Sequence, residues 1–334
     1  MMRDGCLIIA EAGVNHNGDV DLAYKLCDEA KKAGADVVKF QTWKTENIIT
    51  TMVNQADYQK NNTGIVESQF DMLKKMELSQ KEFVKIKEYC DFIGITFAST
   101  ADDEESLDFL VSLGIPFIKI GSGEMGNISY LRYIGRKKLP VIMSTGMSSL
   151  ANIETSLRAL RQGGGTDITL LHCTTSYPCA FEDVNLNAMN TIREAFKLPV
   201  GYSDHTLGYA VAVAAVALGA KVIEKHFTLD KNMIGPDHKA SLNPEEFTHF
   251  VKEIRNIEMA MGNGVKEVTS AEKEISRVVL KRIVAKKTIK KGKVITEDDI
   301  CVKRNITGVS CDRWDLILGT SAKKDYKVDE GIEL

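Results

Sequence analysis

Residues 94–122 read GITFASTADDEESLDFLVSLGIPFIKIGS, and this stretch contains one complete copy of the unit from which the fold is built. Two apolar, β-rich runs, GITFAST (94–100) and PFIKIGS (116–122), flank the segment Glu104–Leu113, whose apolar residues recur at helical spacing. Strands that are apolar nearly throughout indicate a parallel sheet that is covered on both faces. The stretch therefore predicts a strand–helix–strand unit with parallel strands.

The same unit recurs along most of the chain. Six further runs are predicted as strands: CLIIAEAG (6–13), DVVKFQT (36–42), PVIMSTG (140–146), DITLLHCTT (167–175), PVGYSD (199–204) and KVIEKHFT (221–228). Helical-period stretches such as Val20–Lys32 and Leu150–Arg161 lie between them. Eight such units in about 250 residues match a closed (β/α)8 TIM barrel. A doubly wound open sheet is the alternative, but the fingerprint GxGxxG does not follow the first strand. We therefore predict an α/β fold with a barrel over residues 1–265.

The pattern changes after the predicted last barrel helix, Pro244–Met261. Residues 266–280 are polar and are predicted to form a partly helical linker. From residue 281 the run KRIVAKKTIKKGKVITEDDICVKR predicts short strands and turns, and hence a small β-rich domain over 281–334. About fifty residues make a limited core, so we expect this domain to dock on its own barrel or on that of a partner. Residues 67–93 hold more helix than one unit needs and are expected to cover one end of the barrel.

Composition and charge exclude several classes of function. The 334 residues are 44% hydrophobic with a net charge of -3, and nothing in this balance calls for nucleic acid or an anionic membrane as a partner. No apolar run approaches the roughly 20 residues of a membrane span, and the first residues lack the pattern of a signal peptide. The seven cysteines form no CxxC pair, which is typical of reduced thiols in a cytoplasmic enzyme. We therefore expect a cytoplasmic location.

Two lysines lie within predicted buried strands, Lys39 in VVKFQ and Lys119 in FIKIG. A buried lysine needs an anionic partner, because otherwise it loses its proton or costs several kcal/mol. Internal salt bridges, for instance from Lys39 to Glu11 or from Lys119 to Glu124, would satisfy both. The functional alternative is a site for a phosphate at the C-terminal ends of the strands, where barrel enzymes carry their active sites. A single lysine would instead suggest a Schiff base.

Two histidines, His205 and His226, stand at the ends of consecutive predicted strands, in GYSDHT and EKHFT. Neighbouring strands of a barrel would bring them together, which favours a metal site. Two protein ligands suit a weakly held Mn²⁺ or Mg²⁺ better than a closed zinc site. His238, in GPDHKAS, is a candidate for substrate contact, and His172 is a candidate core residue.

Eight motifs in order give the chain a family resemblance. EAGVNHNG (11–18), KFQT (39–42), KIGSGE (119–124), STGM (144–147), HCTTSYP (172–178), GYSDHT (201–206), EKHFT (224–228) and GPDHKAS (235–241) resemble the successive signatures of sialic acid synthases. The tail, IKKGKVITEDDI followed by VKR, is similar to the antifreeze-like (SAF) domain of that family. The chain departs from the pattern at STADD, where the family has proline and phenylalanine after Ser-Thr, and at KRNITG, where it has Lys-Arg-Pro-Gly.

The resemblance implies a reaction of phosphoenolpyruvate with an N-acylated amino-sugar aldehyde, in which a nine-carbon 2-keto acid and phosphate form. It implies that His205 and His226 hold a divalent metal, with Mn²⁺ expected first and Mg²⁺ or Co²⁺ as alternatives. Glu124 is the first candidate for proton transfer and Glu11 the second. It also implies a domain-swapped homodimer in which Arg304 reaches the N-acyl group of the sugar. The residues expected to bind phosphoenolpyruvate or sugar are Lys39, Gln41, Thr100, Lys119, Ser122, Ser144, Thr175, Tyr177, Ser203 and Asp237.

The acceptor stays open between two sugars. N-Acetylmannosamine, giving N-acetylneuraminate, is the first interpretation, and 2,4-diacetamido-2,4,6-trideoxymannose, giving N,N'-diacetyllegionaminate, is the alternative. A more remote enzyme class is a Schiff-base pyruvate aldolase with Lys119 as the nucleophile. A sugar-binding protein without enzymatic activity is the other class, and the paired lysines argue against it because a neutral sugar needs no paired cations.

Overall fold

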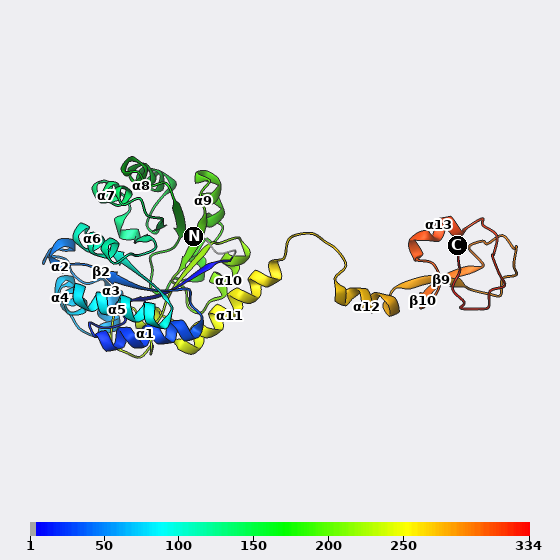
Figure 1. The fold of residues 1–334 in the computed structure, drawn as a ribbon, viewed down its shortest axis with the longest axis horizontal. Coiled ribbons are helices and arrows are strands. Elements are labelled where there is room, and N and C mark those ends of the chain that lie inside the picture. The colour runs from blue at the N-terminus through cyan, green and yellow to red at the C-terminus, as the bar shows by residue number, and fades with distance from the viewer. Residues whose placement is uncertain (1–4) are drawn as a thin grey trace. The chain divides into compact units, whose positions relative to one another are not determined.

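The computed structural model describes residues 5–334 and contains a closed barrel of parallel strands in the order β1 to β8 (Figure 1). The predicted TIM barrel is therefore confirmed. The strands are β1 Leu7–Gly13, β2 Val37–Thr42, β3 Thr96–Ala101, β4 Ile118–Ile120, β5 Val141–Ser144, β6 Ile168–His172, β7 Val200–Asp204 and β8 Val222–His226.

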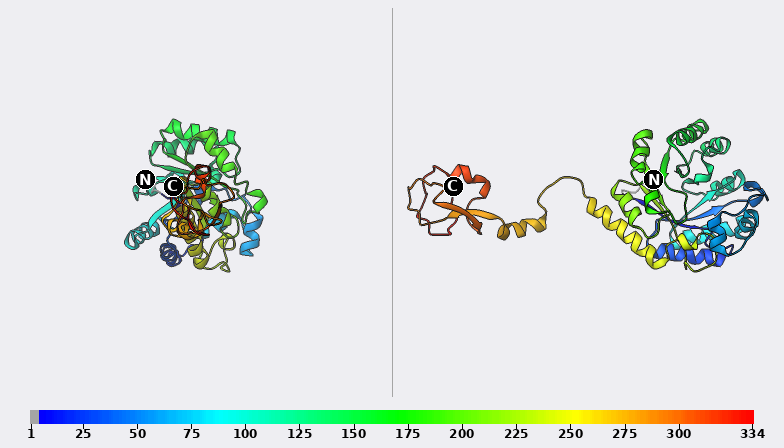
Figure 2. Two further views of the ribbon diagram at one scale, coloured as in Figure 1. Left: turned by 90° about the vertical axis from the view of Figure 1, so that its right-hand side faces the viewer. Right: turned by 180° about the vertical axis from the view of Figure 1, so that it is seen from behind.

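Helices lie around the outside of the strands, as Figures 1 and 2 show. They are α1 Val20–Ala33, α5 Gln80–Ile93, α6 Glu104–Ser112, α7 Ile128–Arg136, α8 Leu150–Gly163, α9 Ala188–Phe196, α10 Ala210–Ala217 and α11 Pro244–Met261. Short 3₁₀ turns also follow several strands: Ser122–Glu124, Phe181–Asp183 and His238–Ala240. Each strand thus has one face on the barrel interior and one face against helices.

Local sequence fixes where the helices begin and end. The side chain of Asp19 accepts from the backbone N–H of Asp21 at the start of α1, and Gly34 ends that helix with a φ of 88°. That left-handed conformation is cheap for glycine and costly for other residues. Ser79 and Glu82 form a reciprocal capping box at the start of α5. These caps define the turns between helices and strands, and therefore the length of each repeat.

An additional helical segment lies between β2 and α5 and consists of α2 Thr45–Ile48, α3 Asp57–Thr63 and α4 Gln69–Met76. Met72 and Met76 of α4 pack against Val14 and Trp43, which follow β1 and β2, so the segment covers that part of the barrel end.

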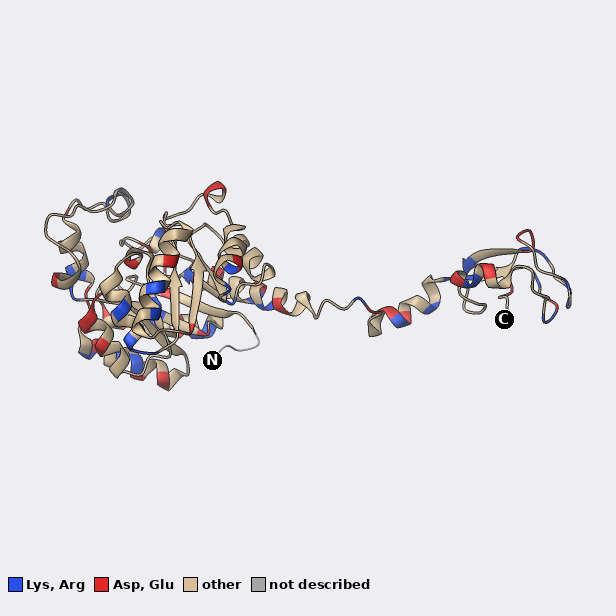
Figure 3. Cartoon of the chain, turned by 90° about the horizontal axis from the view of Figure 1, so that it is seen from above, with Lys and Arg blue, Asp and Glu red and all other residues tan. Residues whose placement is uncertain are grey.

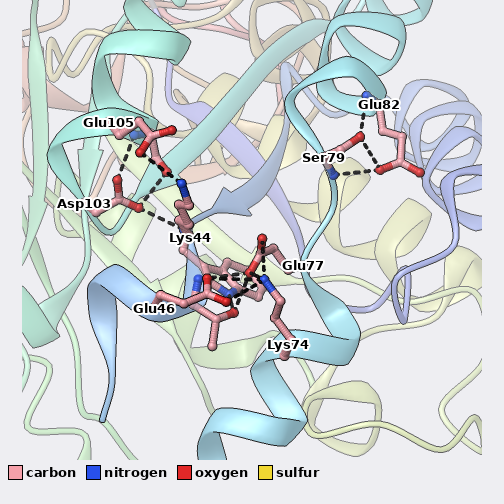
Figure 4. A network of polar contacts seen from close by, with 11 residues as sticks. Lys44, Glu46, Lys74, Glu77, Ser79, Glu82, Asp103 and Glu105 are labelled. Carbon is pink, nitrogen blue, oxygen red and sulfur yellow. Dashed lines mark hydrogen bonds and ion pairs between the residues drawn. The ribbon is translucent and has the colours of Figure 1, made fainter.

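Polar contacts also tie the segment to its surroundings (Figure 4). Glu77 accepts from the backbone N–H of Thr45 at 2.9 Å and from its hydroxyl at 2.6 Å. Lys74 lies 3.0 Å from Glu46 and 3.1 Å from Glu77. The residues that follow β2 are therefore held by the C-terminal end of α4.

The chain divides into two compact units, of which the first ends at Gly262 and the second is Asn263–Leu334. The second unit contains α12 Ser270–Val279, the antiparallel pair β9 Lys281–Ala285 and β10 Ile300–Arg304, a 3₁₀ turn Cys311–Arg313 and α13 Trp314–Ile317. Its small core is built around fully buried residues such as Ile283, Ile289, Tyr326 and Ile332. This matches the β-rich architecture expected of the C-terminal region.

In the part of the chain that the structure describes, no helix has the length and apolar character needed to cross a membrane. Figure 3 shows Lys and Arg mixed with Asp and Glu over both units, as the interspersed signs in the sequence predicted.

Candidate active site

The barrel interior consists of an apolar layer with a polar layer directly above it. Ile9, Val37, Ala98, Phe117, Ile142, Leu171 and Val222 form one buried cluster inside the strands. Because side chains of a strand alternate between faces, the residues two positions further on lie on the same wall, closer to the C-terminal ends. These residues are Glu11, Lys39, Thr100, Lys119, Ser144, Cys173 and Glu224. The floor of the site is thus apolar, and the layer on top of it carries the chemistry.

Two lysines and two carboxylates form an ion-pair cluster in this polar layer. Lys39 Nζ lies 2.6 Å from Glu11 Oε2 and 3.8 Å from Glu224 Oε2, and Lys119 Nζ lies 3.3 Å from Glu224 Oε1. The internal salt bridge weighed for Lys39 is therefore present. Lys119 pairs with Glu224, whereas the sequence had suggested Glu124. The cluster joins β1, β2, β4 and β8 across the barrel.

Hydroxyl groups complete the surroundings of both ammonium groups. Lys39 donates to Thr100 Oγ1 at 2.9 Å, and Lys119 donates to Ser144 Oγ at 2.9 Å. Ser203 donates to Glu224 Oε1 at 3.2 Å. All of these side chains are buried. Cations and hydroxyls on one wall can accommodate an anion with several acceptor oxygens.

The ionisation of this cluster is set by opposing effects. Burial acts to lower the pKa of Lys39, but the carboxylates of Glu11 and Glu224 outweigh it and raise that pKa. Burial acts to raise the pKa of Glu224, but Lys119 and then Lys39 lower it to about 2. Burial raises the pKa of Glu11, while Lys39 opposes the shift. Glu224 is therefore the fixed negative charge of the pair, and Glu11 is the carboxyl that can more readily carry a proton.

Ser122 and Thr175 meet at the loop after β5. The backbone N–H of Gly146 donates to Ser122 Oγ at 2.9 Å. A Cβ at position 146 would lie 2.2 Å from Thr175 Oγ1 and 2.8 Å from Ser122 Oγ, so only glycine allows this approach. Thr175 Oγ1 is buried and makes no hydrogen bond within the described structure. Its hydroxyl therefore remains able to bind a ligand.

His205 and His226 lie together, with ring centroids 5.6 Å apart. His205 Nδ1 is 2.7 Å from the carbonyl oxygen of Thr174, which leaves Nε2 for another partner. His226 Nδ1 is buried and has no hydrogen bond among the described residues, and Asp237 Oδ2 is 4.0 Å away. Burial lowers the pKa of both imidazoles, so both are neutral, and neutral imidazole is the form that ligates metal.

These two histidines fit a divalent cation. The orphaned nitrogen of His226 and the oriented ring of His205 offer two ligands, and the described residues contain no group of three His, Cys, Asp or Glu that could hold a metal. Substrate and water oxygens would have to complete the coordination, which suits an exchangeable Mn²⁺ or Mg²⁺. Tyr177 closes one side of the pair, with its ring 4.3 Å from that of His205 and 5.7 Å from that of His226.

Two residues that were expected to contact the sugar, Gln41 and Asp237, lie beside Glu11 and His226. Gln41 Nε2 donates to Glu11 Oε1 at 2.9 Å. Asp237 is buried, and burial followed by the charge of Glu11 raises its pKa to about 7. A carboxyl with such a pKa can donate or accept a hydrogen bond near neutral pH.

Two of the expected residues, Glu124 and Arg304, belong to elements other than the eight strands of the barrel. Glu124 is half-buried in the 3₁₀ turn after β4, and its Oε2 accepts from Asn127 Nδ2 at 2.7 Å. Arg304 ends β10 in the second unit and has an exposed side chain.

Sequence reasoning left Glu224 without a role, although VIEKH places it two residues after the inner Val222. That alternation was the signal which could have found it. Asp102 was also missed: it follows β3 on the wall of Thr100, and burial followed by Glu124 raises its pKa to about 7. His238 was considered for substrate contact, but it is fully buried, with Nδ1 2.6 Å from Thr228 Oγ1 and Nε2 3.2 Å from Asn17 Oδ1. Those contacts connect the loops after β1 and β8.

Known proteins resemble the chain over nearly its whole length. A model of the NeuB family matches residues 26–266, and a model of the SAF domain matches residues 282–333. An N,N'-diacetyllegionaminic acid synthase of Campylobacter jejuni is 50% identical over 326 residues, which are 97% of this chain and 98% of the relative. A second enzyme of that name, from Legionella pneumophila, is 45% identical over 94% of this chain and 90% of its own length. The crystal structure of the N-acetylneuraminic acid synthetase of Leptospira borgpetersenii in complex with citrate has a TM-score of 0.71 at 34% identity, covering 81% of this chain and 90% of that one.

Proposed function

The chain belongs to the NeuB family and ends in a SAF domain, and from this premise we propose that it condenses phosphoenolpyruvate with 2,4-diacetamido-2,4,6-trideoxymannose to give N,N'-diacetyllegionaminate and phosphate. The choice of acceptor rests on the two N,N'-diacetyllegionaminic acid synthases, which are 50% and 45% identical to the chain. N-Acetylmannosamine, the first interpretation from the sequence, becomes the second candidate.

The observation that carries the condensation is the cationic wall of the barrel beside the histidine pair. Lys39 and Lys119, with the hydroxyls of Thr100 and Ser144, offer charge and donors to the carboxylate and phosphate of phosphoenolpyruvate. Ser122, Thr175 and Ser203 extend this set of hydroxyls. Each lysine already has a carboxylate partner, which favours a role as an electrostatic clamp over a role as a Schiff-base nucleophile.

We propose that His205 and His226 hold the divalent cation, with Mn²⁺ first and Mg²⁺ or Co²⁺ as alternatives. When bound, such an ion acts as a Lewis acid toward the aldehyde oxygen of the acceptor. Tyr177, Gln41 and Asp237 surround the same position and would orient the hydroxyl and acetamido groups of the sugar.

The reaction forms one carbon–carbon bond, consumes one water molecule and requires proton transfer. C3 of phosphoenolpyruvate bonds to the aldehyde carbon, water adds at C2, and the tetrahedral product loses phosphate to leave the 2-keto acid. We place Glu11 first for proton transfer, because it is buried, has a raised pKa and pairs in register with His226 across β1 and β8. Glu124, nearer the solvent, is second. Positioning of both substrates and of the reacting water supplies the remaining advantage.

We also propose that the protein works as a domain-swapped homodimer in which Arg304 serves the barrel of the partner. The helix α12 has no buried residue, and Ile275, Val278 and Leu280 are exposed on it or directly after it. Mixing inactive Arg304→Ala with inactive Lys119→Ala protein tests this. A swapped dimer regains part of its activity through hybrid sites, whereas no regain after exchange of subunits would contradict it.

The decisive test of the function is a product assay by mass spectrometry. Purified protein, phosphoenolpyruvate and Mn²⁺ are incubated in parallel with 2,4-diacetamido-2,4,6-trideoxymannose and with N-acetylmannosamine. We expect phosphate release and a nine-carbon product with the first sugar at a kcat/KM at least tenfold above the second. The reverse preference would make the chain an N-acetylneuraminate synthase. A borohydride-stable adduct with pyruvate would instead favour the aldolase.

A further inference from the structure

A second buried ion pair lies on the opposite face of the strands that carry the histidines. Asp204 and Lys225 are register partners on β7 and β8, with Lys225 Nζ 2.8 Å from Asp204 Oδ2 and both side chains at 0% exposure. Because Ser203 and Glu224 face the barrel interior, their neighbours Asp204 and Lys225 face the helices. The residues on that face two positions earlier, Tyr202 and Ile223, belong to the hydrophobic core.

An ion pair in this position calls for an explanation other than stability. Burying two charges costs more free energy than burying well-packed apolar side chains of similar volume. A buried ion pair is therefore weak evidence of a contribution to stability. The explanation has to come from what the two groups hold in place.

Beyond the ion pair itself, the hydrogen bonds recorded for these two side chains go to Thr206, which follows His205. Lys225 also donates to the carbonyl oxygen of Thr206 at 2.5 Å. Asp204 Oδ1 accepts from the backbone N–H of Thr206 at 2.9 Å and from its hydroxyl at 2.7 Å. The residues before and after His205 are therefore bound to one lysine, and the backbone between them has little freedom.

The same lysine is covalently next to the second histidine. Lys225 immediately precedes His226, whose Nδ1 has no hydrogen bond among the described residues. The ring of His205 is held by the carbonyl of Thr174, and its own carbonyl accepts from the backbone N–H of Cys179 at 2.8 Å. The ion pair thus links the end of β7 to Lys225, the residue that directly precedes His226 on β8.

We propose that Lys225 and Asp204 are positioning residues that set the separation of His205 and His226 for the cation. This inference rests on the metal site in the proposed function. Both side chains face the helices, on the opposite side of the strands from the interior layer that holds Lys39 and Lys119. Removing the pair should therefore weaken the cation site and leave the anion site intact. Residues behind metal ligands generally have effects of about 10–100-fold on metal affinity.

The test compares Lys225→Met with Ile223→Ala, a matched control on the same strand and the same outer face. Binding of Mn²⁺ alone is measured by isothermal titration calorimetry on the full-length protein, and KM for phosphoenolpyruvate is measured at saturating Mn²⁺. We expect Lys225→Met to raise the Kd for Mn²⁺ by about 10–100-fold with KM for phosphoenolpyruvate unchanged within about twofold. Ile223→Ala should lower Tm while its Kd for Mn²⁺ stays within about twofold of wild type.

Two further variants separate positioning from folding. The double variant Asp204→Asn/Lys225→Met should recover part of the Tm, because no unpaired charge is left buried, yet keep the weak Mn²⁺ binding. Thr206→Val removes a single hydrogen bond and carries the test if Lys225→Met does not fold; it should raise the Kd by a smaller factor, about 2–5-fold.

Equal Mn²⁺ affinity of wild type and of every folded variant of the pair would overturn the inference while leaving the proposed function intact. Wild-type protein that binds no Mn²⁺ would overturn the metal site of the proposed function and this inference with it.

Discussion

Replacing Glu224 by Gln tests whether the charge cluster is a site made for an anion. The substitution keeps the shape and an oxygen that can accept from Ser203, but it removes the carboxylate that pairs with Lys119 at 3.3 Å. Lys39 keeps Glu11 at 2.6 Å. Breaking a buried ion pair on one side costs about 3–5 kcal/mol. Because the hydrogen bond with Ser203 is retained, we expect a loss at the lower end, about 3 kcal/mol.

The same change should improve the response to anions. In the variant, the two buried ammonium groups share one carboxylate instead of two, so they should bind phosphate more strongly than the same groups do in the wild type. We therefore expect phosphoenolpyruvate or inorganic phosphate to stabilise Glu224→Gln against urea by about 1–2 kcal/mol more than it stabilises the wild type. The two predicted effects, a loss without ligand and a larger gain with ligand, distinguish an anion site from a purely structural salt bridge.

Urea unfolding is monitored by the fluorescence of Trp43, which is buried in the barrel unit. The protein carries Trp314→Phe, so the second unit contributes no tryptophan signal. Glu154→Gln is the control, because its pair with Arg158 is exposed and should contribute less than about 1 kcal/mol. An unfolding midpoint of Glu224→Gln equal to that of wild type, or the same phosphate response in both proteins, would refute the reasoning.

Three other outcomes are expected. His205→Ala and His226→Ala should each lose phosphate release that depends on Mn²⁺ and is abolished by EDTA, and wild-type turnover in both would remove the metal assignment. Gly146→Ala should raise KM for phosphoenolpyruvate at least tenfold, because the new Cβ would lie 2.2 Å from Thr175 Oγ1; an unchanged KM would mean that the hydroxyl site is not used. The second unit should lose stability below about pH 4. The contact with Lys293 holds the pKa of the buried Asp299 below its ordinary value of 3.8, so the ionised carboxylate stabilises the fold above that pH and this stabilisation disappears as pH falls toward the lower folded pKa. Acid titration followed by Trp314 fluorescence would check this, with Asp299→Asn expected to be less stable at pH 7 and to lack that dependence.

The strands and their function-bearing ends could be predicted because each is a local pattern. The run 94–122 identified β3, α6 and β4, and the comparisons confirm the resemblance to sialic acid synthases and to the SAF domain. The partner of Lys119 could not be predicted in the same way. Glu124 is near it in sequence, but Glu224 comes from β8 across the barrel, and only closure and register bring the two together. The ion pair of Asp204 and Lys225 was missed for a related reason, since only the register of β7 against β8 brings the two side chains together.

The acceptor sugar could not be predicted from motifs because the two candidates share most of their chemistry. Both present an aldehyde and an acetamido group, so in the proposed function the same lysines, histidines and hydroxyls would serve either sugar. Discrimination has to come from the shape around Tyr177, Gln41 and Asp237, and side-chain positions of that kind are set by packing rather than by local sequence patterns.

The apolar layer under the charge cluster has an electrical consequence. Ile9, Val37, Phe117, Leu171 and their neighbours form a medium of low polarisability directly below two cations and two anions. These charges are poorly screened from below, so their attraction for one another and for a bound anion is stronger than it would be in water. A polar substitution in this apolar layer, for example Leu171→Asn, should weaken the binding of phosphoenolpyruvate although every charged residue remains in place.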